Sequence, residues 1–167
     1  NSLRQQVDKF LGAGISYAPR DLTVVYIGYN DINRLNSLAS SKDEYAKNVD
    51  RLRSKGATNQ NRRMLLVMEH NMLRDPTQTS RTKTNLPVWN QHVATVANAR
   101  SNVIAVDLYT AFERIYANPA RYGFANVTTP NPACPANFEE PTFEEPGIRA
   151  SGATSCPPNR GQSNEFR

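Results

Sequence analysis

Polar residues with catalytic potential follow the first strongly apolar run of the sequence. The run at residues 22–27 stops at Gly28-Tyr29-Asn30-Asp31. A glycine at this point permits a sharp turn, and the side-chain amide of Asn30 can then donate an N–H to an oxyanion that develops above a sheet. An Asn-Asp pair also begins many ordinary turns. The four residues alone therefore leave both interpretations open.

Three other residues have side chains suited to chemistry. His70 follows the apolar run at residues 64–68 and is a candidate substrate contact, with crevice or surface packing as the alternative. Asp107 ends the third apolar run, where capping of a following helix is the more usual role. His92 lies within a predicted helix as a solvent-facing or half-buried residue. Neither histidine has a second ligand at metal-binding spacing, so we expect no metal and no cofactor.

These residues must be positioned by the elements that the apolar pattern predicts. Runs at residues 22–27, 64–68 and 103–107 are too uniformly apolar to face water, which predicts neighbouring parallel strands. Amphipathic stretches separate them, so the order is αβαβαβα. This alternation predicts an α/β fold, a three-layer α/β/α sandwich with a flavodoxin-like parallel sheet. Ligands of such sheets bind beyond the carboxyl ends of the strands, which is where Asn30 falls.

Start signals place the predicted helices. Residues 2–11 open with the capping box formed by Ser2 and Gln5. A second capping box predicts a helix that begins at Ser41. The third helix is predicted to begin at Asn85, with Pro87 in its first turn. A short fourth helix, carrying Tyr109 to Tyr116, follows the last strand.

The length of 167 residues predicts one domain, whose composition changes near residue 122. Residues 123–167 hold seven of the 11 prolines and only six Leu, Ile, Val or Phe side chains. We therefore predict a central α/β portion at residues 1–122 and a Pro-rich loop segment of the same domain at residues 123–167.

The net charge of +5 does not by itself indicate a nucleic-acid partner. The only basic cluster, at residues 51–63, has no interleaved aromatic side chains, which favours a solvated helix end over a nucleic-acid groove. No stretch approaches the roughly 18 apolar residues of a membrane span, so we expect no integral membrane segment. No glycine-rich phosphate loop follows a predicted strand, which disfavours a nucleotide-binding domain.

Features of the Pro-rich segment indicate an oxidising compartment. Both cysteines, Cys134 and Cys156, lie there, where a disulfide that pins the loop is more plausible than two buried thiols. Asn126 begins the only acceptor sequon for N-glycosylation. Together they predict a secreted protein, although each feature also arises by chance in cytosolic proteins.

The blocks at residues 5–11, 24–31, 89–90, 106–109 and 118–124 together resemble the SGNH (GDSL) family of esterases and lipases, particularly its secreted lipase and haemolysin-like branch. This resemblance covers nearly the whole chain. It implies an SGNH-hydrolase-like fold, with Asn30 as an oxyanion-hole donor and with Gly28, Tyr29 and Asp31 beside the substrate. A cysteine pair often follows these blocks in the family, as Cys134 and Cys156 do here.

Two family blocks have no counterpart in the sequence. The Gly-Asp-Ser block supplies the family's nucleophile, and the Asp-x-x-His block supplies its acid and base. Both are required for acyl transfer through a serine. We therefore expect residues 1–167 to be a central fragment, incomplete at both ends, of a hydrolase that acts on a small-molecule or lipid ester. The alternative is a non-catalytic carbohydrate- or lipid-binding module on the same scaffold. The sequence does not reveal the oligomeric state.

Overall fold

A parallel sheet of three strands organises the chain. The computed structural model describes residues 2–74, 78–124 and 127. Its strands are β1 (Leu22–Tyr26), β2 (Arg63–Val67) and β3 (Val103–Val106), in the spatial order β1-β2-β3. Val24 pairs with Leu65, and Leu65 pairs with Ile104. The predicted parallel neighbours are thus confirmed, which places the three strand ends at one edge of the sheet.

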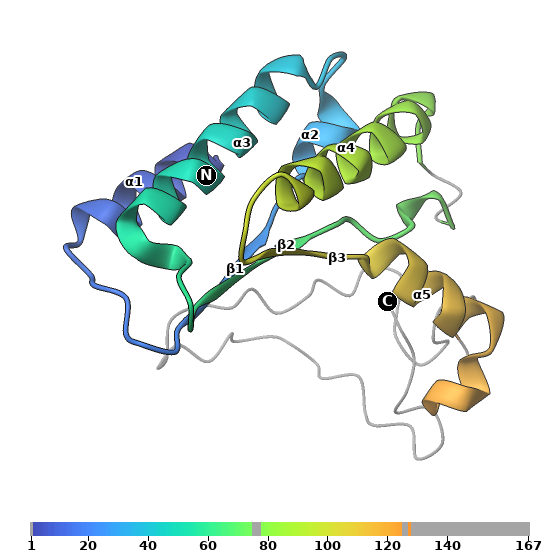
Figure 1. Cartoon of the computed structure of the whole chain (residues 1–167). Helices are drawn as coiled ribbons and strands as arrows, with labels where there is room; N and C mark the ends of the chain where they lie inside the picture. The colour runs from blue at the N-terminus through green and yellow to red at the C-terminus, as the bar shows by residue number, and fades with distance from the viewer. Residues whose placement is uncertain (1, 75–77, 125–126, 128–167) are drawn as a thin grey trace, which may run out of the picture. The chain divides into compact units, whose positions relative to one another are not determined.

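Helices alternate with these strands as predicted, and residues 29–34 form an additional short helix that was not predicted. The helices are α1 (Leu3–Gly12), α2 (Tyr29–Arg34), α3 (Ala39–Leu52), α4 (Ser80–Asn98) and α5 (Leu108–Ala117). The shorter turns are η1 (Arg53–Ala57), η2 (Met72–Arg74) and η3 (Pro119–Tyr122). Figure 1 shows α1, α3 and α4 over one face of the sheet. The contacts divide the chain after Phe112, and residues before that point carry the sheet and helices α1 to α4.

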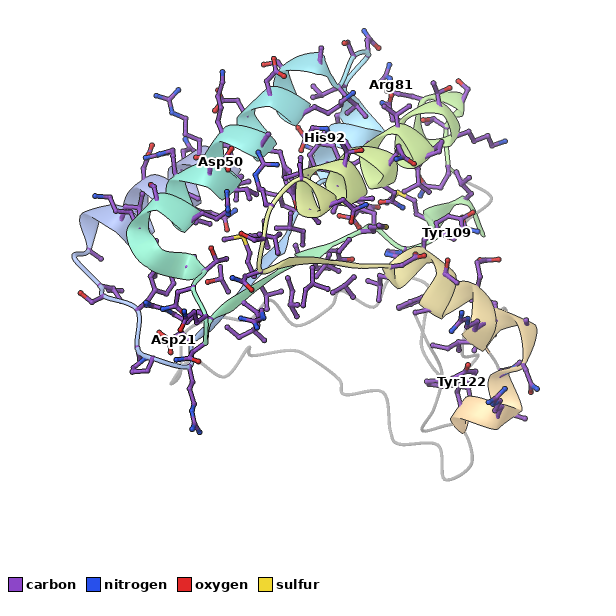
Figure 2. All side chains as sticks on the ribbon, viewed as in Figure 1. Asp21, Asp50, Arg81, His92, Tyr109 and Tyr122 are labelled. Carbon is purple, nitrogen blue, oxygen red and sulfur yellow. The ribbon has the colours of Figure 1, made fainter. Side chains whose placement is uncertain are left out.

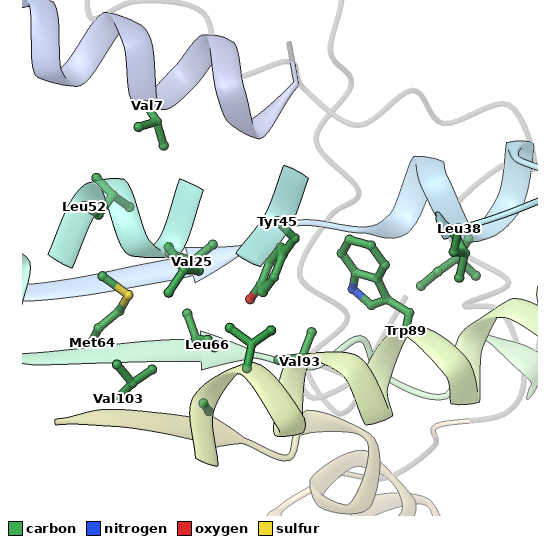
Figure 3. Packing of buried hydrophobic residues seen from close by; sticks show 14 of the residues in the cluster. Val7, Val25, Leu38, Tyr45, Leu52, Met64, Leu66, Trp89, Val93 and Val103 are labelled. Atoms are coloured by element: carbon green, nitrogen blue, oxygen red, sulfur yellow. The ribbon is translucent and has the colours of Figure 1, made fainter. Parts of the chain in front are cut away.

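The main hydrophobic core lies between the sheet and this helical layer. Val25, Met64 and Leu66 project from the strands into it and are buried. Above them the Trp89 ring of α4 meets the Tyr45 ring of α3 edge-on, with 5.3 Å between centroids (Figure 3). Edge-to-face pairs of this kind add specific attraction to the burial of apolar area. The opposite face of the sheet is less covered by the described residues, since Val24, Tyr26 and Ile104 are about half exposed.

The first predicted helix start is confirmed, and the second is wrong. Ser2 and Gln5 form the expected reciprocal capping box of α1. By contrast, α3 begins at Ala39, two residues before Ser41, and no side chain caps it. The Ser41 hydroxyl instead donates a 2.7 Å hydrogen bond to Asp31 on α2. The Ser41 side chain, on which the capping prediction relied, therefore bonds to a residue of another helix instead of capping α3.

The predicted start of the third helix is also wrong. Thr79 caps α4, and Asn85 and Pro87 both lie inside the helix. The Asn85 side chain is buried, and its amide donates to the backbone carbonyls of Ile32 (3.0 Å) and Leu35 (2.9 Å). Asn85 thereby satisfies carbonyl groups at the end of α2, which explains an asparagine in a buried helical position.

Polar contacts tie α3 to α4 and the turn after it. Arg100 makes a two-pronged pair with Asp50, at 2.7 and 2.6 Å. These hydrogen bonds hold the pKa of Asp50 below its usual range. His92 on α4 lies 2.9 Å from the carbonyl oxygen of Lys42 on α3, and Figure 2 shows its position between the helices. The expectation of a half-buried structural histidine is confirmed.

Candidate functional site

A cavity of about 930 Å³ opens where β1 ends. Its wall includes Tyr29, Asn30 and Asp31 from α2, and Glu69 from the segment after β2. Arg4 of α1 and Arg34 of α2 also line it, so the wall carries charges of both signs. Parallel topology puts the ends of β1 and β2 side by side, which explains why these polar residues share one cavity.

Asn30 combines exposure with an unused side-chain amide. It lies in the first turn of α2 and is exposed to the cavity. Its side chain makes no hydrogen bond to any of the described residues, although its neighbours Asp31 and Ser41 bond to each other. The amide is thus available to donate to a ligand atom, as an oxyanion-hole donor must.

Gly28 gives the chain its change of direction between β1 and α2. Its φ of 141° is in a region that residues with a Cβ rarely adopt. The residue is also pressed against the Trp89 indole, because a Cβ built on Gly28 would overlap Nε1 and Cε2 of that ring. Gly28 accepts a 2.9 Å hydrogen bond from the backbone N–H of Ile32, which starts α2. Glycine is therefore required here both for the turn and for the close approach of α4.

Glu69 contributes a buried carboxyl group to the same cavity. Its exposed fraction is 2%, and burial raises the pKa of this carboxyl. The Tyr26 hydroxyl donates to Oε2 at 3.2 Å. Burial and the neighbouring Glu69 raise the pKa of Tyr26 to about 12, so Tyr26 keeps its proton for this bond at neutral pH.

The main chain at Glu69 is clamped by Asn90 of α4. The Asn90 side chain accepts from the Glu69 N–H and donates to the Glu69 carbonyl, both at 2.8 Å. With Trp89 against Gly28, two consecutive residues of α4 thus hold both strand ends that form the cavity. The sequence had shown Trp89-Asn90 only as one block of a resemblance, without this role.

Two buried polar atoms in the cavity wall have no hydrogen-bond partner within the part of the chain that the structure describes. They are the Trp89 Nε1–H and the Tyr45 hydroxyl, from residues that are each 2% exposed. Burial also raises the pKa of Tyr45, which keeps its hydroxyl protonated. Unpaired buried donors are costly and uncommon in proteins, so this is an unusual concentration of them.

The structure places the remaining predicted residues as follows. His70 is absent from the cavity lining near Asn30, and its ring packs against Phe112 with 5.4 Å between centroids. Asp107 accepts hydrogen bonds from the backbone and hydroxyl of Thr110, so it caps α5 as expected. The predicted disulfide of Cys134 and Cys156 and the predicted glycosylation at Asn126 lie outside the described residues.

Sequence reasoning missed Glu69 and the helical form of residues 29–34. Glu69 was visible only as the residue on which the second apolar run ends, and His70 beside it drew the functional interpretation. A better signal is the position of Glu69 at a strand end of a parallel sheet, which is shared with Asn30. Asp31 three residues after Gly28 was the available signal for α2, because acidic residues favour a first helical turn.

Two kinds of feature are absent from the described residues. They contain no group of three His, Cys, Asp or Glu side chains that could hold a metal ion. None of the described helices combines the length and apolar content needed to cross a bilayer.

Comparison of the sequence with known protein families finds one family whose model matches most of the chain. The model of the GDSL-like Lipase/Acylhydrolase family matches residues 1–133, which include the whole cavity wall described above. No curated protein matches the chain. The match ends before Cys134, so it does not include the cysteine pair.

Proposed function

Because the chain belongs to the GDSL-like lipase/acylhydrolase family, we propose that it supplies the oxyanion-binding part of a serine esterase. The family indicates hydrolysis of an ester substrate. The observation that carries this function is the Asn30 amide in the cavity beyond β1, which makes no hydrogen bond to the described residues. An unpaired amide on a fixed turn is the kind of donor that stabilises a tetrahedral oxyanion, and it needs no rearrangement at the moment of reaction.

In the proposed reaction, a serine hydroxyl attacks the ester carbonyl and a histidine removes its proton. The carbonyl oxygen becomes an oxyanion that accepts a hydrogen bond from the Asn30 N–H. The histidine then gives the proton to the leaving oxygen, so that collapse expels the alcohol and leaves an acyl-enzyme. Water then releases the acid by the same steps. Residues 1–167 contain neither a Gly-Asp-Ser nor an Asp-x-x-His block. We place both blocks in the same protein outside these residues, and we call that longer chain the full-length protein.

The test compares the two chains on a short-chain aryl ester and a serine-reactive phosphonate probe. The 167-residue chain is expected to show no turnover above background and no adduct, because its sequence holds neither the Gly-Asp-Ser nor the Asp-x-x-His block. The full-length protein is expected to show both. Turnover that survives substitution of the Gly-Asp-Ser serine would contradict the acyl-enzyme mechanism. A phosphonate adduct on a serine of residues 1–167 would contradict the placement of the nucleophile.

We also propose that the protein is secreted, with Cys134 bonded to Cys156. Both cysteines occur in a segment with few apolar side chains, which favours a covalent link in an oxidising compartment. In the protein isolated without reductant, neither cysteine is expected to react with iodoacetamide, and both should react after reduction. Mass spectrometry of the peptides with and without reductant measures this. Alkylation of both thiols before reduction would contradict the disulfide.

A further inference from the structure

Glu69 is a buried acid without a cationic partner among the described residues. Its side chain is 3% exposed, and no lysine or arginine of that part of the chain pairs with it. The Nδ1 atom of His70 lies 4.0 Å from Oε2, but burial lowers the pKa of His70, so this imidazole is neutral at pH 7. Burying an unbalanced carboxyl group is costly. Its presence in the wall of the cavity therefore calls for a positively charged partner that the cavity can admit.

Aromatic side chains line the same cavity. One comes from each of β1, α2, α3 and α4, namely Tyr26, Tyr29, Tyr45 and Trp89. Tyr26 and Tyr29 are about half exposed, so a ligand can reach their rings, and the Tyr26 hydroxyl donates to Glu69 at 3.2 Å. Alkylammonium ions bind favourably against aromatic faces, and a carboxylate adds direct charge attraction. A buried acid in an aromatic wall thus fits an ammonium group better than a neutral group.

The two arginines of the cavity wall do not offset this preference. Arg4 and Arg34 are both exposed, and Arg4 Nε lies 3.8 Å from a carboxylate oxygen of Asp8 outside the cavity lining. Water and salt screen exposed charges strongly, whereas a buried charge is screened much less. The Glu69 carboxylate therefore has the largest electrostatic effect on a ligand inside the cavity.

We propose that this cavity binds an ammonium group on the alcohol part of the ester substrate, with Glu69 as its counter-ion. Asn30 lies beyond β1 and Glu69 lies beyond β2, in the wall of one cavity. Neighbouring parallel strands are about 5 Å apart, so a small ester can contact both residues. The substrate class is then an ester of an amino alcohol. That the ligand is an ester rests on the proposed function, whereas binding of the ammonium group can be measured without turnover.

The first measurement is the binding of two alcohols of the same shape to the 167-residue chain. Choline carries a trimethylammonium group, and 3,3-dimethylbutanol has carbon in place of the nitrogen. Trp89 is the only tryptophan of the sequence and lines the cavity, so its fluorescence reports on occupancy. We expect choline to bind at least about 10-fold more tightly than the neutral alcohol. Equal affinities, or no binding of choline, would overturn the proposal without any variant being needed.

Two matched substitutions assign the preference to the buried acid. Glu69→Gln keeps the size of the side chain and an acceptor for the Tyr26 hydroxyl, but removes the charge. It is expected to weaken choline binding by about 10-fold or more and to leave the neutral alcohol little affected. Glu44→Gln is the control, because Glu44 lines the same cavity but is 42% exposed and lies 3.8 Å from Lys47. Choline binding that survives Glu69→Gln would contradict the role of Glu69 as counter-ion.

The pH dependence of binding gives an independent test. Burial raises the pKa of Glu69, and choline favours the ionised carboxylate. Choline affinity is therefore expected to fall by up to about tenfold per pH unit as the pH drops below the folded pKa, and to level off above it. The Glu69→Gln variant should show no such slope. A slope that persists in this variant would assign the effect to another group and overturn the proposal; the groups that face this region are His70, Tyr26, Arg4, Asp31, Arg34 and Glu44.

The last measurement is turnover of acetylcholine and 3,3-dimethylbutyl acetate by the full-length protein. The kcat/KM ratio of the two esters is expected to favour acetylcholine by about 10-fold or more, and to approach unity in Glu69→Gln. A native preference for the neutral ester would contradict the proposed substrate class. Absence of turnover of both esters and of the short-chain aryl ester would instead refute the proposed function, while the choline titration would still decide whether the cavity binds an ammonium group.

Discussion

Replacing Asn30 with alanine in the full-length protein is expected to lower kcat by about 10²–10³, which corresponds to roughly 3–4 kcal/mol of transition-state stabilisation. KM is expected to change little, because the amide binds the oxyanion more strongly than it binds the ground-state carbonyl. Asn30 is exposed and makes no hydrogen bond to the described residues, so removing its amide leaves none of their groups without a partner. Steady-state kinetics on a short-chain aryl ester measure the effect.

Asn36→Ala is the matched control for this change. Asn36 is also exposed, lies a few residues further along the chain and does not line the cavity. Both variants should melt within a few degrees of the native protein, so a selective loss of kcat in Asn30→Ala reports on catalysis. Near-native kcat in Asn30→Ala would mean that residues 28–31 only end a strand and begin a helix.

Most of the scaffold could be predicted because the strands depend on a signal that is local and strong. Continuous apolar runs bounded by polar residues located all three strands, and the helices between them implied the parallel order that the register shows. The same apolar runs also suggested that both faces of each strand are buried, and among the described residues only one face is well covered. Val25 is buried under the helical layer, whereas Val24 is about half exposed, although both belong to the same apolar run.

The starts of two helices could not be predicted, because the residues that signal a cap have other partners in the fold. Ser41 bonds to Asp31, and Asn85 bonds to the carbonyls of Ile32 and Leu35. Each partner lies ten or more residues away in sequence. Short polar side chains satisfy either a local or a distant group, and the sequence pattern around them does not distinguish the two.

The candidate site could be predicted in part for a related reason. Parallel topology fixes the edge of the sheet at which a site forms, and this indicated Asn30. It does not fix which of several consecutive residues after a strand turns inward. The clamp by Asn90 orients the backbone so that Glu69 enters the cavity wall, while His70 packs against Phe112. That clamp joins residues 21 positions apart, so it follows from the tertiary structure alone.

Replacing Gly28 with alanine is expected to destabilise the fold more than any surface change. The φ of 141° is costly for a residue with a Cβ, and the new methyl group would overlap the Trp89 indole. Strained backbone and overpacking each cost about 1–3 kcal/mol, so the combined loss is expected to be about 2–6 kcal/mol. A loss of that size is a large fraction of the stability of an ordinary domain. Urea unfolding of the 167-residue chain, followed by circular dichroism, measures it.

A double-mutant cycle with Trp89→Leu isolates the contact between the two residues. Leucine has no ring and ends before the position of Nε1, so it should relieve the overlap and leave the backbone strain. Gly28→Ala is therefore expected to cost about 0.5–3 kcal/mol less in a chain that already carries Trp89→Leu than in the native chain. Gly12→Ala is the control, since a Cβ there meets nothing within 4 Å, and it should cause no loss of stability. Strictly additive losses from Gly28→Ala and Trp89→Leu would show that α4 does not press on the turn at Gly28.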